Sequence, residues 1–347
     1  MYKALFSFIT YFLSISVLFS AYSVNVVTVY DALGTGVVEI TADGRTGPYT
    51  VIINSQSQII GPGSTTTTFN NISFGNKVAL IENVHGCIVE LPFTVSKCAL
   101  DIYFFFESNF DILSNSMIPG LHTRGLLPGQ TPISNLVSPT PDGQPYNQAP
   151  WNYAGIEGAG WTEGDYATRF PDATPVDWTL LTVIDTLLTD HTELYKVAGI
   201  VDVEGRFHFA CPNNLRDHIG LETEFYTRIE HRNHMGVLSP SPYHFSNYND
   251  VARFDFRIAD SYRVSTSVGQ IQLGGSLGSW GMLGGDTNQS DFPSYDITGM
   301  DKTEWFETNG TFDNYLPGDM NLDGDVNGMD KAIWFQNNGK SSRVPKN

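Results

Sequence analysis

The sequence predicts a mainly β protein, with two Ig-like or β-sandwich modules followed by a small α-helical module. Short runs rich in Val, Ile, Thr, Tyr and Phe alternate with turns rich in Gly, Pro, Asn and Asp. No segment of the central block shows a sustained helical period. Near the C-terminus, a loop-and-helix motif occurs twice. We expect a leader at residues 1–23, modules at 24–97, 98–283 and 284–340, and a tail at 341–347.

The leader has the features of a secretory signal peptide. Lys3 precedes an apolar stretch from Ala4 to Phe19, and Ala21 and Ser23 fit the small residues before a cleavage site. An uncleaved membrane anchor is the alternative, because the apolar run is nearly long enough to span a bilayer. Cleavage after Ser23 would leave a mature chain without a transmembrane segment. We therefore expect a secreted protein that is extracellular or attached to the cell surface.

The charge balance excludes one class of partner. The chain has 19 Lys and Arg residues against 37 Asp and Glu residues, which gives a net charge of −18. Such an acidic chain is not suited to neutralising phosphates, so we expect no nucleic-acid partner.

The three cysteines leave two alternatives open. Cys87 and Cys98 flank a short strand-like stretch and can form a disulfide in an oxidising compartment. Three buried thiols, with Cys211 as the third, are the other interpretation. No Cys-x-x-Cys pair is present to indicate zinc or thiol redox chemistry.

The module at 24–97 shows strand patterns separated by turns. The expected strands are residues 26–30, 37–41, 49–54 and 77–82. This spacing is typical of a small β-sandwich. The stretch from Gly44 to Val51, with Gly86 and Cys87, resembles the short Ig-like repeats of Bacteroidetes surface adhesins.

The module at 98–283 begins with an apolar strand at 102–107, followed by a long loop region at 114–175 rich in Pro, Gly, Ser and Asn. Strand patterns return at residues 176–184, 195–203, 206–210, 224–232 and 251–258. We interpret this block as a second β-sandwich with a long insertion.

Two features of the central module suggest ligands. Trp151 and Trp161 lie in a glycine-rich loop, where aromatic rings either contact glycans or cover the edge of a sandwich. His231 and His234 suggest a metal site, but residues three apart on a strand point to opposite faces. Hydrogen bonding and packing at a strand end are the favoured roles for this pair.

The C-terminal module is an internal duplication. Residues 297–302 recur as residues 326–331, a spacing of 326 − 297 = 29. Trp305-Phe306 recurs as Trp334-Phe335. We expect both tryptophans to pack in a core between the two helices.

Each half of the duplication begins with an oxygen-rich loop. Calcium requires six to eight hard oxygen ligands, and Gly324 permits the sharp turn that such a loop needs. Transition metals would require His or Cys, which the loops lack. The expected ligands of the second loop are the side chains of Asp319, Asn321, Asp323 and Asp330 and the backbone carbonyl of Asp325. A turn rich in Asp and Asn without metal is the alternative.

The first loop is irregular, because Ser290 stands where a carboxylate is expected and Asp291 is its only nearby replacement. Weaker or altered binding is expected here, or none. Its expected ligands are Asp286, Asn288, Ser290, Asp296 and Asp301. The two loops together predict one or two Ca²⁺ ions.

The block at 284–340 resembles a type I dockerin, in which two calcium loops, each followed by a helix, are related by pseudo-twofold symmetry. In cellulosomal dockerins, exposed helix positions bind a cohesin. Residues 99–345 resemble the C-terminal half of secreted Bacteroidetes surface proteins that are labelled haemagglutinin-like or dockerin-containing. The resemblance implies an extracellular β-domain fused to a calcium module and supplies no reaction.

These observations favour a non-catalytic, calcium-binding structural or adhesive protein of the cell surface or matrix. Its expected partner is either itself, with filaments as one form of assembly, or a cohesin-like or other surface protein, and glycans are a further partner class. The alternative is a dockerin-bearing component of polysaccharide degradation, either a glycoside hydrolase or a carbohydrate-binding module. The central block lacks a convincing acid/base pair and a nucleophile elbow, so we expect no enzyme activity.

Overall fold

The computed structural model describes residues 22–30, 35–42, 47–134, 139–187, 191–212, 214–247, 250–259, 261–274, 278–289 and 295–346. Most of the expected signal peptide lies outside these ranges. The chain divides into two compact units, one formed by residues 1–25, 38–69 and 76–93 and the other by residues 26–37, 70–75 and 94–347. Each unit is described by itself. None of the helices in the described ranges has the length and apolar character needed to cross a lipid bilayer.

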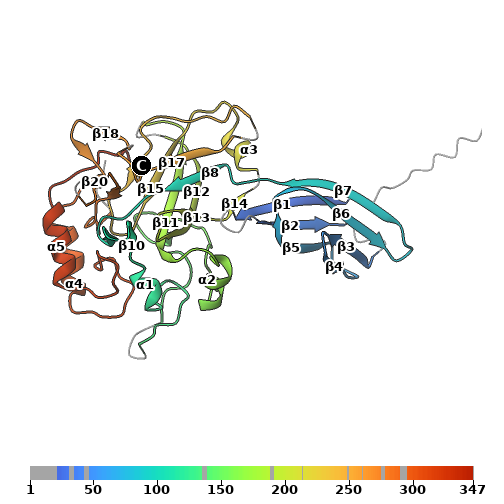
Figure 1. Cartoon of the computed structure of the whole chain (residues 1–347), viewed down its shortest axis with the longest axis horizontal. Coiled ribbons are helices and arrows are strands. Elements are labelled where there is room, and N and C mark those ends of the chain that lie inside the picture. Colours follow the sequence, from blue (N-terminus) through green and yellow to red (C-terminus); the bar gives the residue numbers. More distant parts are fainter. Residues whose placement is uncertain are drawn as a thin grey trace, which may run out of the picture. The chain divides into compact units, whose positions relative to one another are not determined.

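The N-terminal strands, drawn in blue to teal in Figure 1, form one four-stranded sheet alone and a second one together with β14, drawn in yellow. Their order is β4-β3-β6-β7 in one sheet and β14-β1-β2-β5 in the other. The strands are β1 (Ser23–Tyr30), β2 (Thr35–Thr41), β3 (Tyr49–Ile53), β4 (Gln56–Ile60), β5 (Thr66–Ser73), β6 (Gly75–Asn83), β7 (Ile88–Val95) and β14 (Cys211–Pro212). All four strand segments predicted in this module coincide with strands of the structure.

The core of the first unit follows from the period of two in its strands. In β3, Tyr49, Val51 and Ile53 are buried while the residues between them are half-buried. Val38 and Ile40 of β2 alternate in the same way. Alternate side chains of a strand point to opposite faces, so each sheet has one dry face and one wetter face.

The second unit is built around a five-stranded antiparallel sheet of order β13-β12-β11-β15-β16. Its strands are β11 (Pro175–Ile184), β12 (Glu193–Asp202), β13 (Phe207–His208), β15 (Tyr226–Glu230) and β16 (Val237–Leu238). Every residue of β11 is buried, as expected for a central strand covered on both faces. The structure is therefore mainly β, as predicted.

Short strand pairs accompany this sheet instead of a second large one. The pair β8–β17 is parallel, and the other three pairs are antiparallel. These strands are β8 (Leu100–Tyr103), β9 (Phe110–Asp111), β10 (Ser116–Met117), β17 (Ala252–Asp255), β18 (Arg263–Val264), β19 (Ser267–Val268), β20 (Gln270–Gln272) and β21 (Trp280–Met282).

The central module also contains short helices, which the periodicity did not predict. They are α1 (Gly120–Thr123), the 3₁₀ helix η2 (Pro145–Asn147), α2 (Glu163–Arg169) and α3 (Leu215–Ile219). Helices of three to seven residues complete at most two turns, so no sustained 3.6-residue pattern marks them. In α2, Thr162 and Asp165 form a capping box that fixes its start.

The expected Cys87–Cys98 disulfide is wrong, and so is its alternative of three buried thiols. Cys98 pairs with Cys211, with their Cα atoms 5.7 Å apart, and Cys87 is a free, exposed thiol. The reason is the extended strand between the two expected partners. The eight residues of β7 span roughly 26 Å at about 3.3 Å per residue, whereas bridged Cα atoms lie within about 7 Å.

Two helices, α4 (Asp301–Thr308) and α5 (Gly328–Asn337), lie side by side at the C-terminal end of the second unit, in red shades in Figure 1. Their apolar residues share one core with the central sheet, because Ile184, Met235 and Leu238 belong to the same buried cluster as Trp305 and Trp334. The chain from residue 94 onward is thus one packed body.

Candidate functional site

Two aspartates make equivalent hydrogen bonds in the described parts of the two halves of the C-terminal duplication. One carboxylate oxygen of Asp301 accepts hydrogen bonds from the backbone N–H groups of Thr287 and Asn288 at 2.7 and 2.8 Å, and the other accepts from Thr298 at 2.6 Å. Asp330 does the same in the second half, accepting from Met320, Asn321 and Asn327 at 2.7, 3.1 and 2.8 Å. Each aspartate therefore fastens its loop to the start of its helix.

The two halves also exchange contacts. The indole Nε1–H of Trp305 donates to the carbonyl of Asn327, and that of Trp334 donates to the carbonyl of Thr298, both at 2.6 Å. Both tryptophans are buried, as expected from the duplication. Lys331 lies over the Trp305 ring at 5.3 Å, and Lys302 lies over the Trp334 ring at 5.5 Å. Each helix is thus held by residues of the other repeat.

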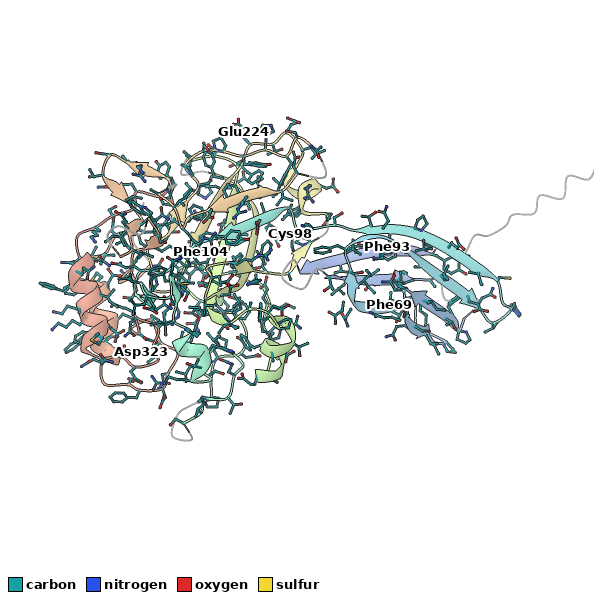
Figure 2. All side chains as sticks on the ribbon, viewed as in Figure 1. Phe69, Phe93, Cys98, Phe104, Glu224 and Asp323 are labelled. Carbon is teal, nitrogen blue, oxygen red and sulfur yellow. A yellow bond between two sulfur atoms is a disulfide. The ribbon has the colours of Figure 1, made fainter. Side chains whose placement is uncertain are left out.

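The second loop gathers oxygen atoms around the fully buried Asp319. One oxygen of Asp319 accepts the N–H of Asp323 at 3.1 Å, and the other accepts the N–H of Gly324 at 2.9 Å. Asn321 contributes a side-chain oxygen to the same N–H of Asp323 at 3.2 Å. Figure 2 shows Asp323 in the loop that precedes α5. Gly324 has a φ of 91°, a turn conformation that favours glycine.

The electrostatics of this loop favour a bound cation. Burial, with the neighbouring carboxylates of Asp330 and Asp323, raises the pKa of Asp319 to about 8 against the opposing charge of Arg232. Burial also raises the pKa of Asp330. Raised pKa values show that burial disfavours the charged forms of these two carboxylates. Ionising both at neutral pH therefore destabilises the loop unless a positive charge compensates for their desolvation.

The first loop is described only in part. Asp286 and Asp301 are fully buried, and Asn288 and Asp296 are half-buried. The predicted ligand Ser290, and Asp291 as its replacement, lie outside the described residues.

Within the part of the chain that the structure describes, no three side chains of Asp, Glu, His or Cys form a ready-made metal group. The predicted ligand Asp325 turns its carboxylate toward Arg124 at 2.8 Å. Arg124 also pairs with Asp313 and donates to the carbonyl of Asp323. These Arg124 contacts clamp the second loop, and sequence patterns could not predict them because Arg124 lies about 200 residues before that loop.

A buried charged network joins the second loop to the central sheet. Asp177 of β11 accepts from Arg232 at 3.1 Å, from His231 at 3.0 Å and from the Tyr315 hydroxyl at 2.7 Å. The Arg232 guanidinium also stacks on the Tyr315 ring at 4.2 Å. Burial alone would raise the pKa of Asp177, but Arg232 and His231 hold it below its usual value. The ion pair of Asp177 and Arg232 at the centre of the network is therefore buried.

His231 and His234 form hydrogen bonds, the role favoured above. Burial lowers the pKa of both rings, so both are neutral at pH 7. Asp177 can only accept, so His231 carries its hydrogen on Nε2 and accepts the Nδ1–H of His234 at 3.0 Å. His234 Nε2 then accepts from the Ser108 hydroxyl at 2.8 Å. The strand ends at Glu230, so the opposite-face argument does not apply to this pair.

The two tryptophans proposed for glycan contact lie in different surroundings. Trp151 packs edge-on against Tyr146, with ring centroids 5.0 Å apart. Trp161 lines a cavity of about 240 Å³ beside Trp178. Of the two, Trp161 lines this cavity and Trp151 does not.

Exposed apolar side chains occur at equivalent positions of the two repeats. Phe306 and Phe335 are 72% and 76% exposed, and Met300 and Met329 are 60% and 65% exposed. Exposed apolar groups that gather on one module mark an interaction surface more often than scattered ones do.

No family model matches the chain, and no curated protein matches it. One solved structure is similar, a type II cohesin–X–dockerin complex from Acetivibrio cellulolyticus with a mutated N-terminal interface. It is 14% identical, with a TM-score of 0.28 over 47% of this chain and 82% of that chain. A likeness at this TM-score does not establish a shared fold.

Proposed function

We propose that this chain is a non-catalytic, exported calcium-binding structural protein that assembles with other protein chains. The observation that carries the proposal is the second C-terminal loop, in which Asp319 and Asp330 are buried together and Asn321 and Asp323 stand beside them. The predicted signal peptide supports export, and the equivalent geometry of the two repeats supports a dockerin-like module.

The residues of the second loop fit a calcium ion. Each oxygen of Asp319 accepts one N–H group and so keeps a lone pair for a cation. Asp319, Asn321, Asp323 and Asp330 would hold the ion, together with the predicted carbonyl of Asp325. The ion would supply the positive charge that the buried carboxylates lack, and its binding would add to the stability of the folded state.

The exposed phenylalanines support a protein partner. Phe306 and Phe335 occupy equivalent places on α4 and α5, so the module offers two similar apolar contact points. Aromatic and Met side chains are enriched at protein interfaces. The partner is either a second copy of this chain or another surface protein.

The test combines calcium titration with light scattering on the mature protein. Calcium at 100 times its Kd stabilises a folded state by about 2.7 kcal/mol, so thermal unfolding should shift upward by several degrees. Asp323→Asn should weaken this shift, because it removes a charged ligand from a half-buried position. Asp172→Asn, at an exposed site outside the loop, is the control.

Growth into assemblies only in the presence of calcium would support the whole proposal. A calcium-induced stabilisation that Asp323→Asn leaves unchanged would remove the second loop as the site. A protein that stays monomeric and shows no thermal shift with millimolar calcium would refute the proposal.

A further inference from the structure

A cavity of about 240 Å³ opens in the second unit, outside the C-terminal loops. Its walls come from the loop before α2, from α2 itself and from strands β8, β11, β12 and β13. The volume is close to the lower end of the roughly 300–1,000 Å³ that ligand sites usually occupy. It therefore suits a small ligand.

Aromatic rings form one part of the cavity wall. Trp161 lies 5.4 Å from Trp178 and 6.2 Å from Phe170, measured between ring centroids. Phe207 and Phe209 stack on each other at 5.2 Å on the strand side. These rings give the cavity the apolar surface on which the C–H faces of a sugar pack.

Glycine shapes this wall. A Cβ atom at Gly158 would lie 2.5 and 2.7 Å from two ring carbons of Trp178, and its φ of 75° also disfavours other residues. The loop can therefore lie directly on the Trp178 ring only with glycine at this position.

Charged groups at the cavity balance one another. Asp101 and Arg206 form an ion pair at 3.6 Å, and their side chains remain 20% and 30% exposed. Arg169 stacks over Trp161 at 4.5 Å, and Glu157 adds a second carboxylate. Two carboxylates against two guanidinium groups leave no net charge to attract an ion.

We propose that this cavity binds a neutral pyranose sugar. The aromatic wall offers packing for the C–H face of the ring. The exposed Asp101–Arg206 pair offers an acceptor and donors side by side for neighbouring hydroxyl groups. A purely apolar ligand would leave that ion pair dehydrated without new partners, which is costly. This inference does not depend on the calcium site.

The experiment is isothermal titration of the full chain with neutral monosaccharides, chosen after a glycan-array screen. A single sugar ring is expected to bind with a Kd on the order of 1 mM. Asp101→Asn keeps the side-chain shape and should weaken binding by about tenfold to a hundredfold. Trp161→Ala should abolish it. Trp151→Ala, the matched control in the same loop region, should leave the Kd unchanged, because Trp151 does not line the cavity.

The outcomes separate cleanly. Binding that is weakened in Asp101→Asn but unchanged in Trp151→Ala supports the proposal, and circular dichroism of Asp101→Asn establishes that this variant is folded. Absence of binding for every neutral sugar up to 50-fold above the expected Kd, roughly 50 mM, overturns it. Binding of an octanoate probe that sugars do not displace would also overturn it, by showing that the cavity selects apolar chains.

Discussion

Replacing Arg232 with methionine tests how strongly the buried network fastens the C-terminal module. Arg232 is 4% exposed and its partner Asp177 is fully buried, so the variant leaves a carboxylate without its counter-charge. Breaking a buried ion pair in this way costs about 3–5 kcal/mol. At about 2–4 °C per kcal/mol for a unit of this size, Arg232→Met should lower Tm by about 6–20 °C.

The assay is urea unfolding and calorimetry of Arg232→Met beside Arg253→Met. Arg253 is 59% exposed and pairs with Asp255 at 3.6 Å, so its loss should cost at most about 1 kcal/mol. In the double variant Asp177→Asn with Arg232→Met, removal of both charges should restore part of the stability. A cost below about 1 kcal/mol for Arg232→Met, or additive effects in the double variant, would refute the reasoning.

The same network gives a pH dependence with a definite sign. The pKa of Asp177 is lowered in the folded state, so its contribution is present above the unfolded pKa and is lost as pH falls through the folded pKa. The gap in stability between wild type and Arg232→Met should therefore narrow in acid. A gap that stays constant from pH 7 to the acid transition would contradict a charge-based mechanism.

Three further predictions concern other parts of the chain. Replacing Cys98 and Cys211 with alanine should cost about 2–5 kcal/mol in denaturant unfolding, because their disulfide closes a loop with a separation of 113 residues; an equal midpoint for the variant and the oxidised wild type would contradict this. Arg124→Gln should loosen the second loop and speed its amide hydrogen exchange, while global stability falls by about 1 kcal/mol; unchanged exchange would show that the clamp is idle. Phe306→Ala with Phe335→Ala should leave Tm within about 2 °C while abolishing assembly in light scattering; intact assembly would remove these residues from the interface.

The sequence predicted those features of the fold that depend on the local pattern of residues. Runs of β-branched residues matched β3 and β11 within one or two residues, because strand formation there depends on neighbours in the chain. Comparing the two repeats predicted that Trp305 and Trp334 are buried, and the structure buries both. The calcium ligands and the partner stay predictions.

Sequence patterns could not predict the contacts between segments that lie far apart in the chain. The Cys98–Cys211 bridge, the Arg124 clamp and the ion pair of Asp177 with Arg232 each join residues more than 50 positions apart. Periodicity and spacing describe short windows of the chain, so they carry no information about pairings that the tertiary fold creates. The short helix α2 was missed for the opposite reason, since its signal is a capping box and not a period.

The contacts of Trp305 and Trp334 resemble an isologous interface, because each repeat donates the same hydrogen bond to the other. A single repeat on its own would have to find a second copy to complete its helix. Joining both copies in one chain makes that encounter intramolecular, so it does not depend on protein concentration. Because the two repeats belong to one chain, their helices need not have the same sequence. Their surfaces can therefore differ and contact different neighbours while the shared tryptophan contacts stay the same.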